Sequence, residues 1–279
     1  MLRRKGLGKM ARVMRNAVVI TMCALALLLF VGRRRFPKVQ SSELARNSGL
    51  NGEQAKTKEI DMARDFAPKT KLTARHDGWR LILVNCDHPL ADDFLDSVTL
   101  KAIHGTALKV DERILDDLEQ MLGDAKNDGI DLEVYSAYRS FQRQKVLFEQ
   151  GVKERVSNGM KRDEAEQETA TWIARPGSSE HHTGLAVDIA TPSHQGLDES
   201  FRGTAAYQWL LKNAPKYGFV ERYPQGKVGI THINPEPWHY RYIGRDLAPL
   251  LEASGLCYEE YFECYLAPIF ESTNLSQEI

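Results

Sequence analysis

The sequence predicts an α+β fold, in which helices and short strands share one hydrophobic core. In some segments apolar residues recur with the 3.6-residue period of a helix, and in others they alternate with polar residues as in a strand. The two kinds of segment do not follow one another in the regular order of a parallel βαβ fold, which favours the α+β class. A hydrophobic content of 42% and a charged content of 27% are ordinary for a folded domain.

The first element predicted in this domain is a short buried strand at residues 81–84. Asp111 can then cap a helix, which a polar turn ending in Gly129 terminates. Residues 130–134 alternate apolar and polar side chains, which is typical of a strand. The apolar positions that give the helix its period are Ile114, Leu115, Leu118, Met121 and Leu122.

The later elements are predicted from the same patterns. Ser140 can cap a helix that runs to about Gln150. The others are a charged helix at 161–173, a strand at 185–190, a helix at 203–213, a strand pair around 218–220 and 238–243, and two helices at 245–254 and 258–266.

Charge is unevenly distributed along the chain. Of the 37 Lys and Arg residues, ten lie in residues 1–40, which contain no Asp or Glu. Residues 41–279 therefore hold 27 basic and 38 acidic residues, a net charge of −11. An acidic domain argues against nucleic acid as the main partner.

The basic N-terminal region has the pattern of an export signal. Residues 17–31 are apolar apart from Thr21, and six Lys and Arg residues precede them. No small-residue cleavage site follows, so we expect a single-pass signal-anchor rather than a signal peptide whose cleavage would release a secreted protein. The positive charges before the span predict a cell-membrane protein with its main body outside the cytoplasm. The expected organisation is a basic, membrane-spanning segment at 1–36, a polar linker at 37–70 and a globular domain at 71–279.

The four cysteines do not form a disulfide framework. Cys257 and Cys264 are close enough in sequence to pair in an exported protein. The segment between them is predicted to be helical, however, and seven residues along one helix separate them by nearly two turns. The sequence leaves this pairing open, and a hydrophobic core is expected to stabilise the domain.

The strand at 185–190 is the first candidate for chemistry. Its alternation places three larger apolar residues on one face and Asp188, between two alanines, on the other. The small neighbours leave room for a metal ion beside Asp188, and an unpaired buried carboxylate would be costly. Gly184 permits a sharp turn through which His181 can reach Asp188.

A second candidate lies at residues 235–244, where His239 occupies a strand face and Glu236 precedes it by three residues. A catalytic zinc needs three nitrogen or oxygen ligands and an open position for water. His181, Asp188 and His239 would supply three ligands. Glu236 would then be close enough to act as a base, because zinc lowers the pKa of its water to about 7.

A third candidate is Arg139, predicted to lie between a strand and the next helix, with Gln144 about one turn further on. A fixed guanidinium at a strand end suits a carboxylate or a developing oxyanion. Each of the three groups is weak alone, and their co-occurrence carries the functional prediction.

Together these motifs resemble the zinc D,D-carboxypeptidases of the VanY type. These belong to the LAS group of zinc proteins, which also includes D-Ala-D-Ala dipeptidases, L,D-carboxypeptidases and the hedgehog signalling domain. The resemblance covers about residues 80–245 and implies a single domain with a small central antiparallel sheet flanked by helices. The matching positions are Ser136, Tyr138, Arg139, Ser140 and Gln144, then Ser179, His181, Gly184, Ala186 and Asp188, then Glu236, Trp238 and His239.

The resemblance also implies roles. One zinc ion would be held by His181, Asp188 and His239. Glu236 would be the catalytic base, and Arg139 would contact the scissile carbonyl or its oxyanion. The implied substrate-binding residues are Tyr138, Gln144, Ser179 and Trp238.

Three further polar residues near these motifs receive no catalytic role. His182 and Glu180 fall on positions that the motif leaves variable, and Glu180 is expected to be solvated or to make a hydrogen bond behind the ligands. His232 is expected to be a polar loop residue.

The implied activity is hydrolysis of the terminal D-Ala-D-Ala bond of peptidoglycan stem peptides or precursors, with a contribution to glycopeptide (vancomycin) resistance. An L,D-carboxypeptidase acting on tetrapeptides remains the nearest alternative. A D,D-dipeptidase is less consistent with export, because those enzymes act in the cytoplasm. A non-catalytic, zinc-containing cell-wall binding module is the third alternative, and the presence of Glu236 argues against it.

Overall fold

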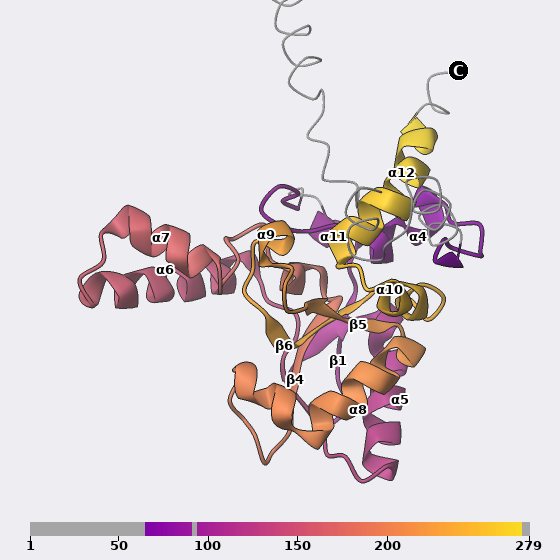
Figure 1. Cartoon of the computed structure of the whole chain (residues 1–279), viewed down its shortest axis with the longest axis horizontal. Coiled ribbons are helices and arrows are strands. Elements are labelled where there is room, and N and C mark those ends of the chain that lie inside the picture. The colour runs from indigo at the N-terminus through magenta and orange to yellow at the C-terminus, as the bar shows by residue number, and fades with distance from the viewer. Residues whose placement is uncertain (1–64, 91–93, 275–279) are drawn as a thin grey trace, which may run out of the picture. The chain divides into compact units, whose positions relative to one another are not determined.

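The computed structural model describes residues 65–90 and 94–274. Its centre is a four-stranded antiparallel sheet in the order β3-β4-β6-β5. Strands β4, β5 and β6 of this sheet are labelled in Figure 1. A separate two-stranded hairpin joins β1 (Leu100–Ala102) to β2 (Lys109–Asp111). The strands of the central sheet are β3 (Glu133–Ser136), β4 (Ala186–Ala190), β5 (Phe219–Tyr223) and β6 (Glu236–Tyr242). The predicted α+β class with an antiparallel sheet is confirmed.

Helices flank this sheet. The α-helices are α4 (Ala74–Leu81), α5 (Glu112–Asn127), α6 (Phe141–Ser157), α7 (Arg162–Ala170), α8 (Ala205–Asn213), α9 (Val228–Thr231), α10 (Ala248–Ser254), α11 (Tyr258–Tyr261) and α12 (Ala267–Asn274). Short 3-10 turns occupy η1 (Phe94–Ser97), η2 (Glu180–Thr183), η3 (Glu199–Gly203) and η4 (Ala214–Tyr217), and a π-helical turn, η5 (Phe262–Leu266), joins α11 to α12.

The larger hydrophobic core lies between one face of the sheet and helices α5 and α8. Ile114 and Leu118 of α5 are fully buried in the same cluster as Val187 and Ile189 of β4. Burial of each such side chain stabilises the fold by about 1.5–3 kcal/mol. Because this core covers one face of β4, the alternate residues of that strand face the other way and can carry polar groups.

A second core lies at the C-terminal end of the domain. Leu81 of α4, Val220 of β5 and Leu251 of α10 are buried there with Tyr258 and Tyr261 of α11. This cluster joins the first described helix to the last ones, so segments far apart in sequence stabilise one another.

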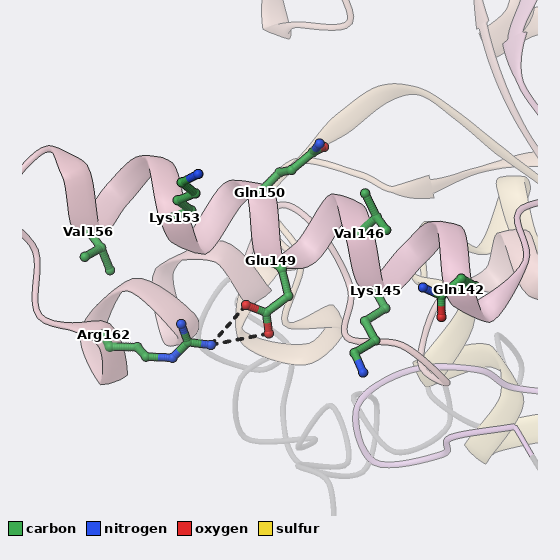
Figure 2. Close-up of a pocket in the computed structure, with 8 residues that line it drawn as sticks. All are labelled: Gln142, Lys145, Val146, Glu149, Gln150, Lys153, Val156 and Arg162. Atoms are coloured by element: carbon green, nitrogen blue, oxygen red, sulfur yellow. Dashed lines mark hydrogen bonds and ion pairs between the residues drawn. The ribbon is translucent and has the colours of Figure 1, made fainter.

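Helices α6 and α7 form a hairpin that extends from the sheet (Figure 1). The two helices approach closely at Gly151, where a Cβ atom would lie 2.9 Å from the Thr169 side chain. On the exposed face of α6, Glu149 forms an ion pair of 3.0 Å with Arg162 of α7 (Figure 2). Gly151 therefore permits helix packing rather than ending α6, which explains why α6 continues to Ser157 beyond the predicted end at Gln150.

The strand predicted at residues 81–84 is wrong. Leu81 ends α4, and the extended residues after it pair with no strand among the described residues. Side chains satisfy carbonyl groups at the end of α4 and just after it instead. Arg241 donates to the carbonyls of Arg80 and Ile82, and the Tyr258 hydroxyl donates to that of Leu81.

Most other elements occur where they were predicted. Asp111 caps α5 by accepting a hydrogen bond from the Arg113 amide. The strand predicted from residue 130 begins later, at Glu133, and the helix predicted at 258–266 continues as α11, η5 and α12 to Asn274. Cys257 is a buried free thiol, so no disulfide joins it to Cys264.

The predicted signal-anchor at residues 1–36, and the linker as far as residue 64, lie outside the described residues. Within the described part of the chain, no helix has the length and apolar character needed to cross a membrane.

Candidate active site

Three strands place polar side chains in one row across the sheet face opposite the larger core. Asp188 of β4 lies directly opposite Ser136 of β3 on one side and His239 of β6 on the other. In antiparallel pairs, directly opposed residues have Cβ atoms about 4.5–5.5 Å apart. The strand register therefore brings Asp188 and His239 together although fifty-one positions separate them.

His181 reaches the same row from the short turn η2. Gly184 ends this turn with a φ of 71°, and the chain then enters β4. The His181 Nδ1 atom donates to the Ala137 carbonyl at 2.7 Å, which leaves the Nε2 lone pair 3.2 Å from Asp188 Oδ2. The turn predicted at Gly184 is thus confirmed, and a backbone carbonyl selects the His181 tautomer.

His239 faces Asp188 through Nδ1, whereas His181 faces it through Nε2. The His239 Nδ1 atom lies 3.2 Å from Asp188 Oδ1, and its Nε2 atom lies 3.6 Å from Glu180 Oε2. Burial lowers the pKa of His239, but the neighbouring carboxylates of Asp188, Glu180 and Glu236 outweigh this effect and raise it to about 9. A carboxylate behind Nε2 favours the tautomer whose Nδ1 lone pair points at Asp188.

These donor atoms fit a zinc ion. One nitrogen or oxygen from each of His181, Asp188 and His239 lies within 4.8 Å of the others, and all three residues are buried. The Asp188 Oδ1 atom, also buried, has no hydrogen-bond partner within the described residues. Two imidazoles and one carboxylate leave a fourth tetrahedral position for water or substrate, as a catalytic zinc requires.

Glu236 lies beside this row, at the start of β6. Its Oε2 atom is 3.5 Å from His239 Nδ1, and the side chain is almost fully buried. Burial raises the pKa of Glu236 to about 8, and the charge of Asp188 adds to the increase. A carboxylate with a pKa near neutrality can both accept and return a proton.

Arg139 approaches the row from the loop between β3 and α6. It donates from Nη2 to Ser136 Oγ at 2.8 Å and from Nη1 to Gln144 Oε1 at 2.9 Å, and Nη2 lies 3.6 Å from Asp188 Oδ2. Gln144 in turn donates to the Ala174 carbonyl at 2.6 Å. The amide of Gln144 is therefore engaged in fixing Arg139.

A cleft of about 260 Å³ opens over these groups. Ser179 and Trp238, both predicted to bind substrate, line it with Arg139 and Gln144. Tyr138 is half-buried and is not among the residues that line the cleft. Apolar side chains that the sequence analysis did not single out also line it: Leu147, Trp172, Ile173, Leu197 and Ile233.

Comparison with known proteins agrees with this geometry. The sequence profile described as VanY: D-alanyl-D-alanine carboxypeptidase matches residues 107–245. A D-alanyl-D-alanine carboxypeptidase of Enterococcus faecalis is 36% identical over 204 residues, which cover 72% of this chain and 73% of that protein. The chain belongs to the VanY family.

Two solved structures extend the likeness to three dimensions. VanYB in complex with D-alanine-D-alanine is 37% identical with a TM-score of 0.61, covering 66% of this chain and 98% of that one. A VanY D,D-pentapeptidase mutant from a VanB-type resistance cassette, in complex with Zn(II), is 36% identical with a TM-score of 0.60, covering 66% and 99%.

In this VanY-family chain a network of buried charged side chains lies behind the row formed by His181, Asp188 and His239. The Glu180 Oε1 atom accepts hydrogen bonds from Arg222 at 2.8 Å and from Arg241 at 2.7 Å, and Arg222 also pairs with Glu259. All four side chains are almost fully buried. Burial alone would raise the pKa of Glu180, but Arg222 and Arg241 hold it well below its ordinary value.

Glu180 is therefore not solvated, and the expectation of a solvated side chain is wrong. The alternative expectation, a hydrogen bond behind the row, is met by the bonds that Oε1 accepts from Arg222 and Arg241, while Oε2 lies 3.6 Å from His239 Nε2. Sequence reasoning missed Arg222 and Arg241. One signal in the sequence could have indicated them. Arg241 lies on the same strand face as His239, and a buried cation at that position requires a buried carboxylate partner.

His182 has a structural role in the same turn. Its Nδ1 atom donates to the Arg139 carbonyl at 2.6 Å, and its Nε2 atom accepts from the Gly177 amide at 3.2 Å. The ring stacks on Phe141 with centroids 4.1 Å apart. His182 thus fixes the backbone that carries Arg139, and it contributes no donor to the group formed by His181, Asp188 and His239.

Proposed function

We propose that this chain is a zinc-dependent D,D-carboxypeptidase that removes the terminal D-alanine from peptidoglycan stem peptides or their precursors. The observation that supports this most strongly is the convergence of His181, Asp188 and His239 with Glu236 at the base of a cleft. Membership of the VanY family and the D-alanyl-D-alanine ligand of its relative VanYB support the substrate class.

The zinc, when bound, supplies Lewis acidity that makes water acidic and polarises the scissile carbonyl. Side chains of the protein transfer the proton and stabilise the developing charge. Glu236 accepts the proton of the attacking water and returns it to the amine of the departing D-alanine. Arg139, fixed by Ser136 and Gln144, places its guanidinium where negative charge develops on the carbonyl oxygen.

The decisive experiment uses the full-length, zinc-loaded chain with muramyl tri-, tetra- and pentapeptides, and measures released D-alanine. We expect release from the pentapeptide alone, and we expect metal removal and Glu236→Ala to abolish it. Release from the tetrapeptide alone would make the enzyme an L,D-carboxypeptidase. No cleavage of any peptide, by wild type or variant, would leave a binding module as the function.

We also propose that residues 1–36 anchor the protein in the cell membrane with the catalytic domain outside. The apolar span, its flanking arginines and an extracytoplasmic substrate support this arrangement. Protease added to intact spheroplasts should digest the catalytic domain. In a separate fractionation of untreated cells, the protein should be found with the membranes. A protected, soluble protein would contradict the proposal.

In this location, removal of terminal D-alanine would take away the binding target of glycopeptide antibiotics. We therefore propose a contribution to vancomycin resistance. Expression of the wild-type chain should raise the inhibitory concentration of vancomycin relative to Glu236→Ala, and equal values would contradict a role in resistance.

A further inference from the structure

A second group of metal-binding side chains lies at the rim of the cleft, apart from the row that contains Asp188. Cys86 and Asp87 come from the turn after α4, and His232 comes from the end of α9. One sulfur, one oxygen and one nitrogen from these residues lie within 4.8 Å of one another. All three residues are exposed, so a cation from solvent can reach them.

The backbone at His232 is unusual. Within the described residues it is the one non-glycine position with a positive φ, at 61°. A β-carbon in this left-handed region costs about 1–2 kcal/mol, which glycine would avoid. The conformation holds the His232 Nε2 atom 3.8 Å from Asp87 Oδ2. Strain of this kind tends to accompany a functional constraint on the side chain.

The other side of the group is rigid. The Asn85 side chain accepts hydrogen bonds from the amides of Asp87 and His88, at 3.0 and 2.9 Å, which closes the turn. The Asn85 amide also donates to the buried carboxylate of Glu259 at 3.2 Å. Cys86 and Asp87 therefore project from a turn that is anchored in the protein interior.

The distances suit a tetrahedral metal. With bonds of about 2.0–2.3 Å, neighbouring ligand atoms of a zinc ion lie about 3.3–3.8 Å apart. The 3.8 Å between His232 Nε2 and Asp87 Oδ2 already meets this spacing. The three ligand atoms all lie within 4.8 Å of one another, so side-chain shifts of about 1 Å bring the other pairs to the same spacing. A cavity of about 50 Å³ lined by Cys86 and His232 offers space for a water ligand.

Other roles for Cys86 fit less well. Burial and the neighbouring Asp87 raise the pKa of its thiol, so it is not an activated nucleophile. A bound metal would deprotonate it. The nearby cation Arg175 is occupied elsewhere, 3.8 Å from Glu166 and 5.0 Å from the Phe148 ring centre.

We propose that Cys86, Asp87 and His232 form a second metal site, for a divalent cation of the zinc class, that bridges the two loops at the rim of the cleft. Tyr223 and Ile233 line both this cavity and the cleft. The site is independent of the peptidase activity, since it shares no residue with the row around Asp188.

The test uses the full-length, zinc-loaded chain and counts bound zinc by equilibrium dialysis at micromolar free zinc. We expect two equivalents in the wild type and one in Cys86→Ser. His232→Asn, which retains a residue that tolerates left-handed backbone, should weaken the second equivalent by at least about tenfold. Cys264→Ser, at an exposed cysteine elsewhere in the described part of the chain, is the matched control and should bind two.

Cadmium provides a second readout, because a thiolate bound to cadmium absorbs in the ultraviolet. The absorption should appear in wild type and Cys264→Ser and be absent in Cys86→Ser, without release of the first zinc. Retention of that first zinc also shows that each variant is folded. One equivalent in the wild type, or a second equivalent that persists in Cys86→Ser, would overturn the proposal.

Discussion

At the scale of single residues, the imidazoles of the two proposed metal ligands, His181 and His239, are fixed in opposite ways. A main-chain carbonyl binds His181 through Nδ1, whereas a buried carboxylate faces His239 through Nε2. Each contact leaves the other nitrogen pointing at Asp188. Metal affinity in this site therefore depends on residues that never touch the metal.

Glu236→Gln keeps the shape of the side chain and removes its ability to accept a proton. We expect kcat/KM to fall by about 10²–10⁴-fold, the usual contribution of a general base. Zinc content should stay at the wild-type value because Glu236 is not one of the three proposed ligands. Steady-state kinetics on the pentapeptide, together with metal analysis, checks both parts. Unchanged kinetics would exclude Glu236 as the base.

Glu180→Gln removes the carboxylate between two buried arginines. We expect unfolding free energy to fall by about 3 kcal/mol or more, since breaking a buried ion pair leaves uncompensated charge. Zinc affinity should also fall, by about 10–100-fold, because Glu180 orients His239. Denaturant unfolding and chelator competition measure the two effects. Glu166→Gln, at an exposed ion pair with Arg162, is the control and should change neither.

At the scale of elements, the sequence predicted those whose periodicity is local. The β4 alternation and the capped, periodic α5 are both present. The segment at 81–84 could not be predicted in this way, because its carbonyls are satisfied by Arg241 and Tyr258 from the far end of the chain. The candidate site shows the same contrast. His181 and Asp188 lie in one local motif and could be predicted. The burial of Glu180 could not, because it depends on Arg222 and Arg241, which only the fold brings near.

The turn at Gly184 is sensitive to the addition of a single methyl group. A Cβ there would lie 2.8 Å from the Asp111 backbone nitrogen, in addition to the cost of a positive φ. Gly184→Ala should lower the unfolding free energy by about 2–3 kcal/mol and weaken zinc binding, because His181 moves with the turn.

Gly129→Ala is the matched control for this substitution. Gly129 also has a positive φ, of 79°, but no atom lies within 4 Å of its Cβ position. We expect a loss of about 1 kcal/mol with zinc affinity unchanged. Equal effects of the two substitutions in denaturant unfolding and zinc titration would show that the close approach to Asp111 is unimportant.

At the scale of the whole molecule, Asp246 connects the beginning of the described chain to its C-terminal part. It accepts hydrogen bonds from Arg80 of α4 and from Thr70. Burial opposes ionisation, but Arg80 outweighs it and lowers the pKa of Asp246. A lowered folded-state pKa means that the pair stabilises the fold above the unfolded carboxyl pKa of about 3.9 and loses this contribution as pH falls below it.

Asp246→Asn should therefore lower the unfolding free energy at pH 7 by about 1 kcal/mol or less, because the pair is partly exposed. The difference from wild type should shrink toward zero as the pH falls below about 4. Urea unfolding of both proteins across this range provides the measurement, and a difference that is constant with pH would assign the effect to packing instead.

The sheet order gives the strand that carries Glu236 and His239 a particular place in assembly. Among the residues that the structure describes, β6 is the last strand in the sequence, yet it lies between β4 and β5. During synthesis the earlier strands emerge first, and the gap between them is filled only when residues 236–242 arrive. A chain that ends before residue 236 thus lacks the third proposed ligand, the proposed base and an inner strand of its sheet at the same time. Completion of the central sheet and assembly of the proposed catalytic residues are therefore one event, so no cleavage can precede a finished sheet.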